Sequence, residues 1–139
     1  MKPGAGDLAR FHAAQDAIWP GPVEEIRAGR KVSHWMWFVF PQLRSLGRSG
    51  TAQFYGIADL DEAQAYLADP VLRARLREAS AAMLAQAGVS AEAILGPVDA
   101  LKLKSSMTLF DRAGTDPLYS EVLEAFYGGE RCAVTAVAR

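Results

Sequence analysis

The chain has 139 residues, half of them apolar and 22% charged, and its formal net charge is −1 at pH 7. This composition is typical of one globular domain and excludes an intrinsically disordered chain. No segment approaches the roughly 20 apolar residues that cross a bilayer, and the small net charge gives no sign of a nucleic-acid binder. We therefore expect one domain over residues 1–139, with neither a membrane nor a nucleic acid as partner.

The N-terminus, MKPGAGDLARF, contains no apolar stretch of signal-peptide type. The only cysteine, Cys132, excludes an internal disulfide. Both features are typical of a cytoplasmic protein, which is the location we expect. The sequence shows no internal repeat and no change of composition that would mark a domain boundary.

The first elements are short and are separated by proline and glycine. Residues 1–6 are expected to form a loosely ordered tail, and Asp7 is suited to cap a helix that reaches Trp19. Pro20-Gly21-Pro22 ends that helix, and a second short helix is predicted over residues 23–28.

Residues 31–43, KVSHWMWFVFPQL, form the most densely apolar and aromatic stretch of the chain. Because each large aromatic side chain buries roughly 150–250 Å², other elements must pack around this segment. Its nearly continuous apolarity does not separate a buried strand from a buried helix, but Ser33 as a cap and Pro41 as a stop favour a helix. We expect three of its side chains to be mostly buried, and we expect the change of Trp37 to alanine to cost roughly 3–5 kcal/mol. These side chains are Trp35, Trp37 and Phe38.

The second half of the chain carries clearer signals for where helices begin and end. A loop over residues 44–50 leads into a short helix over 51–57. Asp59 and Glu62 have the spacing of a capping box, and two Asp-Pro pairs place an N-cap before a proline at the first helical position. Further helices are predicted over residues 59–68, 70–87, 98–112 and 117–127, with a short turn over 90–95. The tail over 130–139 is expected to be loosely ordered, with a last weak turn as the alternative. The pattern predicts an all-α domain of six or more short helices, packed as an irregular orthogonal bundle.

Four segments, DLARFHAAQ, GRKVSHWMWFVFPQL, EAQAYLADPVLRARL and LKLKSSMTLF, resemble the bacterial family known as domain of unknown function eighteen-ten. The run SHWMWF followed by FPQL is highly specific, because tryptophan, histidine and methionine are rare residues. The resemblance extends from Asp7 to about Gly129 and implies a compact, mainly helical cytoplasmic domain, with no activity attached. Some members carry the label calpastatin, which nothing in this sequence supports. The chain departs from the family's pattern at Asp69, where histidine is common, and at Cys132, where an aspartate often opens the last helix.

A shorter similarity links residues 11–15 and the KLKSSMTLF segment to helical domains that act on NAD-derived metabolites and ADP-ribose conjugates. These motifs are brief and mostly apolar. The similarity therefore carries over no catalytic residue.

The first group of candidate residues lies within the aromatic segment. His34, between Ser33 and Trp35, has the chemistry of a general base or proton shuttle. A histidine whose ring nitrogens are satisfied by backbone or carboxylate groups is the more common alternative. The only other histidine is His12, and no paired spacing exists, so neither a metal nor a cofactor is predicted.

Two further groups lie later in the chain. The loop Gly47-Arg48-Ser49 precedes a predicted helix, and its N–H groups and arginine could hold an anion, although ordinary turns of this composition are more frequent. Lys102, Lys104, Ser105 and Ser106 interrupt an otherwise apolar helix, where the serines either allow close helix packing or line a polar cleft. There is no Gly-x-Ser-x-Gly elbow and no CxxC motif.

If these groups converge, they match an anionic ligand with an aromatic portion, whose ring would stack on a tryptophan. The predicted site has one catalytic residue, His34, and ten ligand-binding residues: Ser33, Trp35, Trp37, Gln42, Gly47, Arg48, Ser49, Lys102, Ser105 and Ser106. The preferred function is binding, or acting on, an anionic small metabolite such as a nucleotide or ADP-ribose derivative. The alternative is a non-catalytic helical protein-interaction module. The sequence patterns do not establish whether the protein is an enzyme, and they identify no protein partner.

Overall fold

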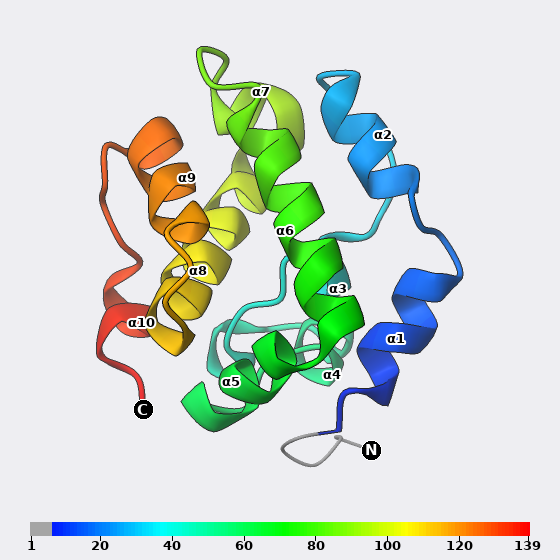
Figure 1. Ribbon diagram of the computed structural model, residues 1–139, viewed down its shortest axis with the longest axis vertical. Helices are drawn as coiled ribbons and strands as arrows, with labels where there is room; N and C mark the ends of the chain where they lie inside the picture. The colour runs from blue at the N-terminus through cyan, green and yellow to red at the C-terminus, as the bar shows by residue number, and fades with distance from the viewer. Residues whose placement is uncertain (1–6) are drawn as a thin grey trace.

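The computed structural model describes residues 7–139, and this range contains ten α-helices and one 3-10 helix (Figure 1). The elements are α1 (Ala9–Asp16), α2 (Gly21–Arg27), α3 (Met36–Val39), η1 (Arg44–Leu46), α4 (Gly50–Phe54), α5 (Leu60–Ala68), α6 (Pro70–Leu84), α7 (Ala91–Leu95), α8 (Pro97–Ala113), α9 (Leu118–Tyr127) and α10 (Ala133–Val137). Within these residues there is no strand, and the only β-type pairing is an isolated bridge between Leu43 and Ile57. The all-α prediction is confirmed. The tail expected over residues 1–6 lies outside the described residues.

Two of the side chains predicted to cap helices, Asp59 and Asp69, do so. Asp7 and Ser33 do not occupy the N-cap positions of α1 and α3, which are Leu8 and Trp35. Asp59 accepts a hydrogen bond from the backbone N–H of Glu62 at 2.9 Å, and Asp69 accepts from the N–H groups of Val71 and Leu72 at 3.0 and 3.1 Å. Each bond satisfies a donor that has no partner within its own helix, so α5 and α6 begin where the sequence predicts.

Three helices end three residues earlier than predicted. The first stops at Asp16, α4 stops at Phe54 and α6 stops at Leu84. After α1 and α6 the chain tightens to hydrogen bonds between residues three apart, from Ile18 N–H to Gln15 O and from Ala87 N–H to Leu84 O, each 3.1 Å long. After α4 the Gly56 N–H bonds Gln53 O in the same way, at 3.2 Å. Such 3-10 turns are frequent at helix C-termini, and apolar periodicity does not distinguish them from a further helical turn.

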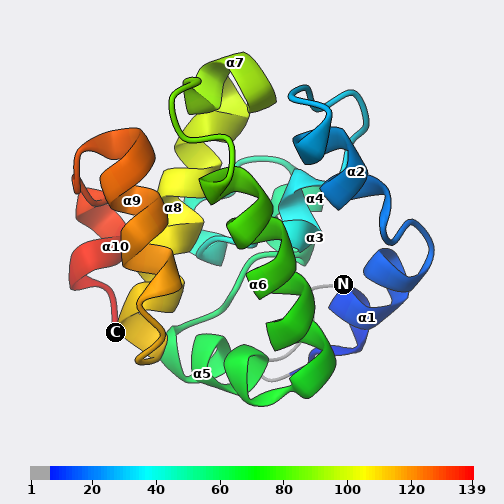
Figure 2. The ribbon, with the colours of Figure 1, turned by 45° about the horizontal axis from the view of Figure 1, so that its top comes forward.

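The helices form two groups on either side of α6 (Figures 1 and 2). On one side lie α1 and α2, and on the other lie α8, α9 and α10. The longest helix, α8, contacts α5, α7, α9 and α10. Edge-to-face and tilted aromatic pairs run through the core from Phe11 to Tyr66, Phe110 and Tyr119, with ring centroids 5.1, 5.0 and 6.1 Å apart. This row of buried rings joins α1, α5, α8 and α9 into one core.

The aromatic segment supplies one further part of that core. Only the residues of α3 are helical, and Met36, Val39 and Phe40 face the interior. Trp35 is 2% exposed, whereas Trp37 and Phe38 have intermediate exposure. All three side chains are therefore mostly buried, as predicted, but Trp37 and Phe38 remain partly exposed where Trp35 does not. Positions three and four apart share one face of a helix, which leaves the intervening residues on another.

A buried ion pair ties α1 to the start of α5. Arg10 donates to the Glu62 carboxylate at 3.0 Å, and the two side chains are 2% and 0% exposed. Arg10 also donates to the carbonyl oxygens of Phe54 and Gly56 at 2.8 and 2.9 Å. The Glu62 carboxylate accepts from Ala58 N–H at 2.8 Å. The pair therefore fixes the whole connection between α4 and α5 against α1.

The C-terminal segment, predicted over 130–139 as a loosely ordered tail or a last weak turn, contains α10, which packs against α8. The Thr135 side chain is fully buried, and its hydroxyl lies 3.1 Å from that of Ser105. Arg112 donates to Thr135 O at 2.8 Å. These long-range polar bonds order a segment whose own sequence carries little helical signal.

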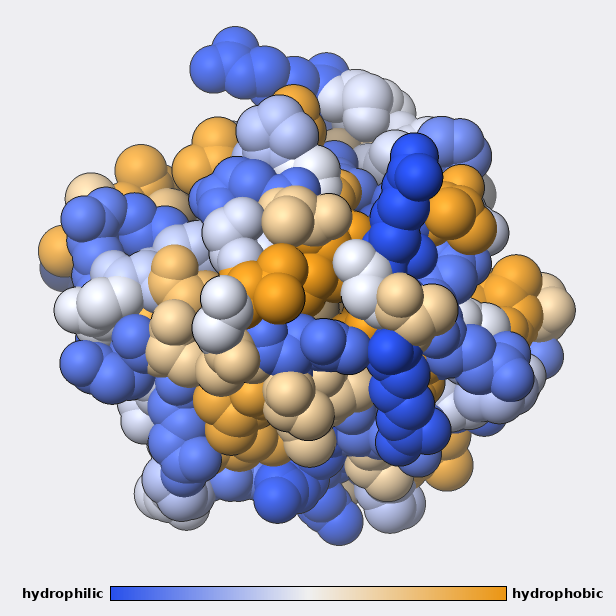
Figure 3. All heavy atoms as spheres, turned by 90° about the horizontal axis from the view of Figure 1, so that it is seen from above, coloured by the Kyte–Doolittle hydropathy of each residue, from blue (hydrophilic) through white to orange (hydrophobic). Residues whose placement is uncertain are grey.

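The described helices include none with the length and apolar composition that a membrane span requires. The face seen from above in Figure 3 shows apolar side chains in small groups separated by hydrophilic ones. Such scattered groups are ordinary on a protein surface.

Candidate functional site

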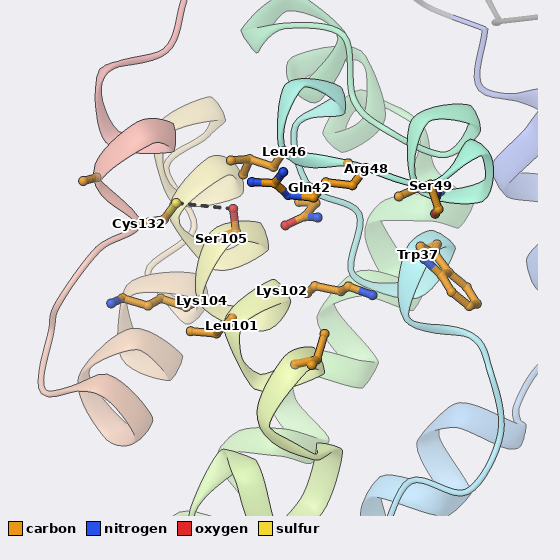
Figure 4. A pocket seen from close by; sticks show the side chains of 14 residues that line it. Trp37, Gln42, Leu46, Arg48, Ser49, Leu101, Lys102, Lys104, Ser105 and Cys132 are labelled. Atoms are coloured by element: carbon orange, nitrogen blue, oxygen red, sulfur yellow. Dashed lines mark hydrogen bonds between the residues drawn. The ribbon is translucent and has the colours of Figure 1, made fainter.

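A pocket of about 690 Å³ lies between the chain that connects α3 to α4 and the helices α8 and α10 (Figure 4). Small-molecule pockets typically have volumes of roughly 300–1,000 Å³. One wall consists of Trp37, Gln42, Leu46, Gly47, Arg48, Ser49 and Ala52. The opposite wall consists of Val98, Leu101, Lys102, Lys104, Ser105, Cys132 and Ala133.

Seven of the residues predicted from the sequence line this pocket: Trp37, Gln42, Gly47, Arg48, Ser49, Lys102 and Ser105. They come from three separate stretches of the chain, which the fold brings together. Four others lie elsewhere. Ser33 and His34 are exposed ahead of α3, Trp35 is buried in the core, and Ser106 is buried within α8.

The residues ahead of α3 are held in place by hydrogen bonds to Glu25, and Ser33, His34 and Trp35 do not line the pocket. One oxygen of its carboxylate accepts hydrogen bonds from Val32 N–H, Ser33 N–H and the Trp35 indole at 2.7, 3.0 and 3.1 Å. Burial raises the pKa of Glu25, but these bonds outweigh it and hold the pKa at about 2. The carboxylate is therefore ionised at neutral pH. Its hydrogen bonds to Ser33 and Trp35 give both residues a structural role that needs no ligand. His34 remains exposed and away from the pocket lining.

The two serines of α8 have different surroundings. Ser105 lines the pocket, whereas the Ser106 hydroxyl is buried and has no hydrogen-bond partner among the described residues. Ser106 is thus a small residue inside the helix packing, and Ser105 faces the pocket. Of the two alternatives for this pair, close helix packing applies to Ser106 and a place in the pocket lining applies to Ser105.

The loop before α4 is built by close packing. Ser49 caps α4 by accepting a hydrogen bond from Ala52 N–H at 3.1 Å. A side chain at position 47 would place its Cβ 2.9 Å from Ala52, so Gly47 permits this approach. The geometry of this turn therefore explains why Gly47 and Ser49 occupy their positions. Arg48 between them is exposed, and in the described part of the chain its guanidinium has no partner.

The cations of the pocket are incompletely neutralised. Lys102 lies 3.4 Å from one oxygen of Asp99 and 5.1 Å from the centre of the Trp37 ring. The other oxygen of Asp99 bonds Lys31 at 2.9 Å, so two lysines share one carboxylate. Lys104 pairs with the exposed Glu130 outside the pocket lining.

The described lining thus contains three basic side chains and no carboxylate. Positive charge in a partly desolvated cleft attracts anions over a distance and holds them by charge-assisted hydrogen bonds. The remaining lining is largely apolar, with Trp37, Leu46 and Leu101 as its largest members. This surface favours an anion that carries an apolar or aromatic portion.

Cys132 lies where α10 begins and closes one end of the pocket. Its Sγ is 3.2 Å from the Thr135 hydroxyl and 3.5 Å from that of Ser105. Burial raises the pKa of the thiol, but these hydrogen bonds outweigh that effect and lower the pKa below the usual value. The described residues contain no cluster of His, Cys, Asp or Glu that could hold a metal ion.

Several lining residues are not among the predicted ligand-binding residues, including Lys104, Cys132 and Ala133. Lys104 belongs to the polar group that interrupts the apolar pattern of α8, and this interruption is the signal that points to it. Cys132 and Ala133 belong to the segment expected to be loosely ordered. A local pattern gives no signal for these two residues, because their place in the pocket depends on how α10 packs against α8.

Comparisons with known proteins agree with this architecture. A family model described as protein of unknown function (DUF1810) matches residues 5–138. The crystal structure of the conserved hypothetical protein Rv1873 from Mycobacterium tuberculosis is similar over 94% of each chain, with 50% sequence identity and a TM-score of 0.91. A search of curated proteins found no match. With nearly its whole length matched by the family model, the chain belongs to the DUF1810 family.

Proposed function

We propose that this protein binds an anionic small metabolite with an aromatic portion, such as a nucleotide or ADP-ribose derivative, in the pocket between α3–α4 and α8–α10. The observation that carries the proposal is the lining itself, with three basic side chains and, among the described residues, no carboxylate. A pocket of about 690 Å³ has room for a nucleotide-sized ligand.

In this arrangement Arg48 and Lys102 approach the anionic group from opposite walls. Arg48 is exposed and free to turn, and its planar guanidinium suits two oxygens of a phosphate or carboxylate. Lys102 is already positioned by Asp99 and by the face of Trp37. The half-buried Trp37 ring offers an apolar surface for the aromatic portion of the ligand.

The proposal is one of binding, and it assigns no reaction. The described lining includes neither a histidine nor a carboxylate that would serve as a general base. His34, predicted as the catalytic residue, is exposed and outside that lining. Its catalytic role stays a prediction without support from its position.

Titration calorimetry with AMP, ADP-ribose and ribose 5-phosphate tests the proposal. We expect saturable binding to the wild type and a loss of about tenfold or more in affinity for Arg48→Ala and for Lys102→Ala, since a hydrogen bond to a charged group contributes about 1.5–3 kcal/mol. Arg27→Ala is the matched control, because it removes an exposed arginine that lies outside the pocket lining. Absence of binding by the wild type, or equal affinities for all four proteins, would contradict the proposal.

A second candidate, a non-catalytic protein-interaction module, is favoured by exposed apolar residues of the pocket lining. Val98 and Leu101 on α8 are 66% and 67% exposed. Apolar side chains that gather in the open are typical of contact surfaces. This candidate predicts that the anions above do not bind at all.

A further inference from the structure

We infer that Gln42 selects the ligand by pairing with the edge of a nucleobase, so that the pocket takes nucleotides rather than simple sugar phosphates. This inference rests on the proposed function and names the class of ligand within it. Gln42 lies on the same wall of the pocket as Arg48, with Lys102 and Ser105 on α8 opposite (Figure 4).

The backbone at Gln42 is fixed. Its carbonyl accepts a hydrogen bond from Ile57 N–H at 2.9 Å, and Arg44 N–H donates to Ile57 O at 2.7 Å. The two segments pack backbone against backbone, because a Cβ at Gly56 would lie 2.3 Å from the Cα of Arg44. The preceding residue, Pro41, is buried. The side chain of Gln42 therefore starts from a position that the fold determines.

The amide of Gln42 is not used by the fold. It is half-buried in the pocket wall and makes no hydrogen bond with the described residues. The other glutamine amides near it differ in this respect. Gln15 donates to Phe38 O at 2.7 Å, and Gln53 donates to Gly47 O at 3.4 Å. Gln42 thus presents a free donor and a free acceptor to whatever occupies the pocket.

A neutral amide adds little to the binding of a phosphate, which Arg48 and Lys102 already attract. Its donor and acceptor instead match a group that offers both, as the edges of nucleobases do. A glutamine amide forms two hydrogen bonds with adenine, one to N7 and one from the N6 amino group. A ligand that lacks the matching edge leaves the amide to water and gains neither bond, which makes Gln42 a determinant of specificity.

The ratio of two affinities tests this inference. Ribose 5-phosphate and four nucleoside 5′-monophosphates, with adenine, guanine, uracil or cytosine as base, are titrated into the wild type, Gln42→Met and the control Gln64→Met. Met keeps the length and volume of the glutamine side chain but neither its donor nor its acceptor. Gln64 is exposed on α5 and does not line the pocket.

We expect the best nucleotide to bind the wild type and Gln64→Met more tightly than ribose 5-phosphate, and this advantage to shrink about tenfold or more in Gln42→Met, since two hydrogen bonds are lost while stacking on Trp37 remains. The affinity for ribose 5-phosphate is expected to be unchanged in Gln42→Met. Equal affinity of the wild type for both ligands, or an advantage of the same size in Gln42→Met, would overturn the inference and leave anion binding intact. If no ligand binds the wild type, the proposed function itself fails and this inference fails with it.

Discussion

Replacing Glu62 by glutamine is expected to lower the free energy of unfolding by about 3–5 kcal/mol. The substitution preserves shape but removes the charge that neutralises Arg10, whose side chain is 2% exposed. An arginine remains charged at any ordinary pH, so the buried guanidinium would be left without its counter-charge. Because a domain of this size is typically stable by only about 5–15 kcal/mol, this is a large share of the total.

Urea unfolding of the wild type, Glu62→Gln and Glu78→Gln measures this effect. Glu78 is exposed on α6, and its neutralisation is expected to change stability by less than about 0.5 kcal/mol. A Glu62→Gln protein as stable as the control would show that the ion pair does not hold α1 to the start of α5.

Replacing Trp35 by alanine is expected to cost about 3–5 kcal/mol, and replacing Trp37 by alanine clearly less. Trp35 is 2% exposed, donates its indole N–H to Glu25 at 3.1 Å and packs against Phe40 with ring centroids 6.3 Å apart. Trp37 is half-buried against the pocket, so its removal leaves no closed cavity in the core. Its loss should weaken ligand binding instead.

The same unfolding experiment separates the two tryptophans. A midpoint for Trp37→Ala that falls as far as that for Trp35→Ala would mean that Trp37 is a core residue. This is what the apolar pattern alone implies, since it treats both tryptophans alike.

The helical architecture could be predicted because its signals are local. A cap such as Asp59 or Asp69 bonds N–H groups two or three residues away, so the sequence carries both partners. The difference between Trp35 and Trp37 is not local. It depends on which face of α3 meets the rest of the core, and a segment apolar on all sides gives no preference.

The candidate site was predicted in part for a similar reason. Arg48, Lys102 and Ser105 were selected because polar groups beside apolar sequence need a partner, and all three line the pocket. The same argument selected His34, which lies in the open, and Ser106, which is buried in the helix packing. The need for a partner can be read from the sequence. Whether water, the core or a pocket meets that need depends on contacts between distant elements.

Labelling of Cys132 with N-ethylmaleimide, followed by mass spectrometry, tests the binding pocket most directly. The chain has one cysteine, it lines the pocket, and the lowered pKa of its thiol favours the reactive thiolate. We expect AMP or ADP-ribose at ten times its Kd to slow labelling about tenfold, because about one pocket in ten is then empty. In Arg48→Ala the same protection should require a higher ligand concentration. A labelling rate that stays constant at saturating concentrations of every anion that binds would place the ligand elsewhere on the protein and contradict the account.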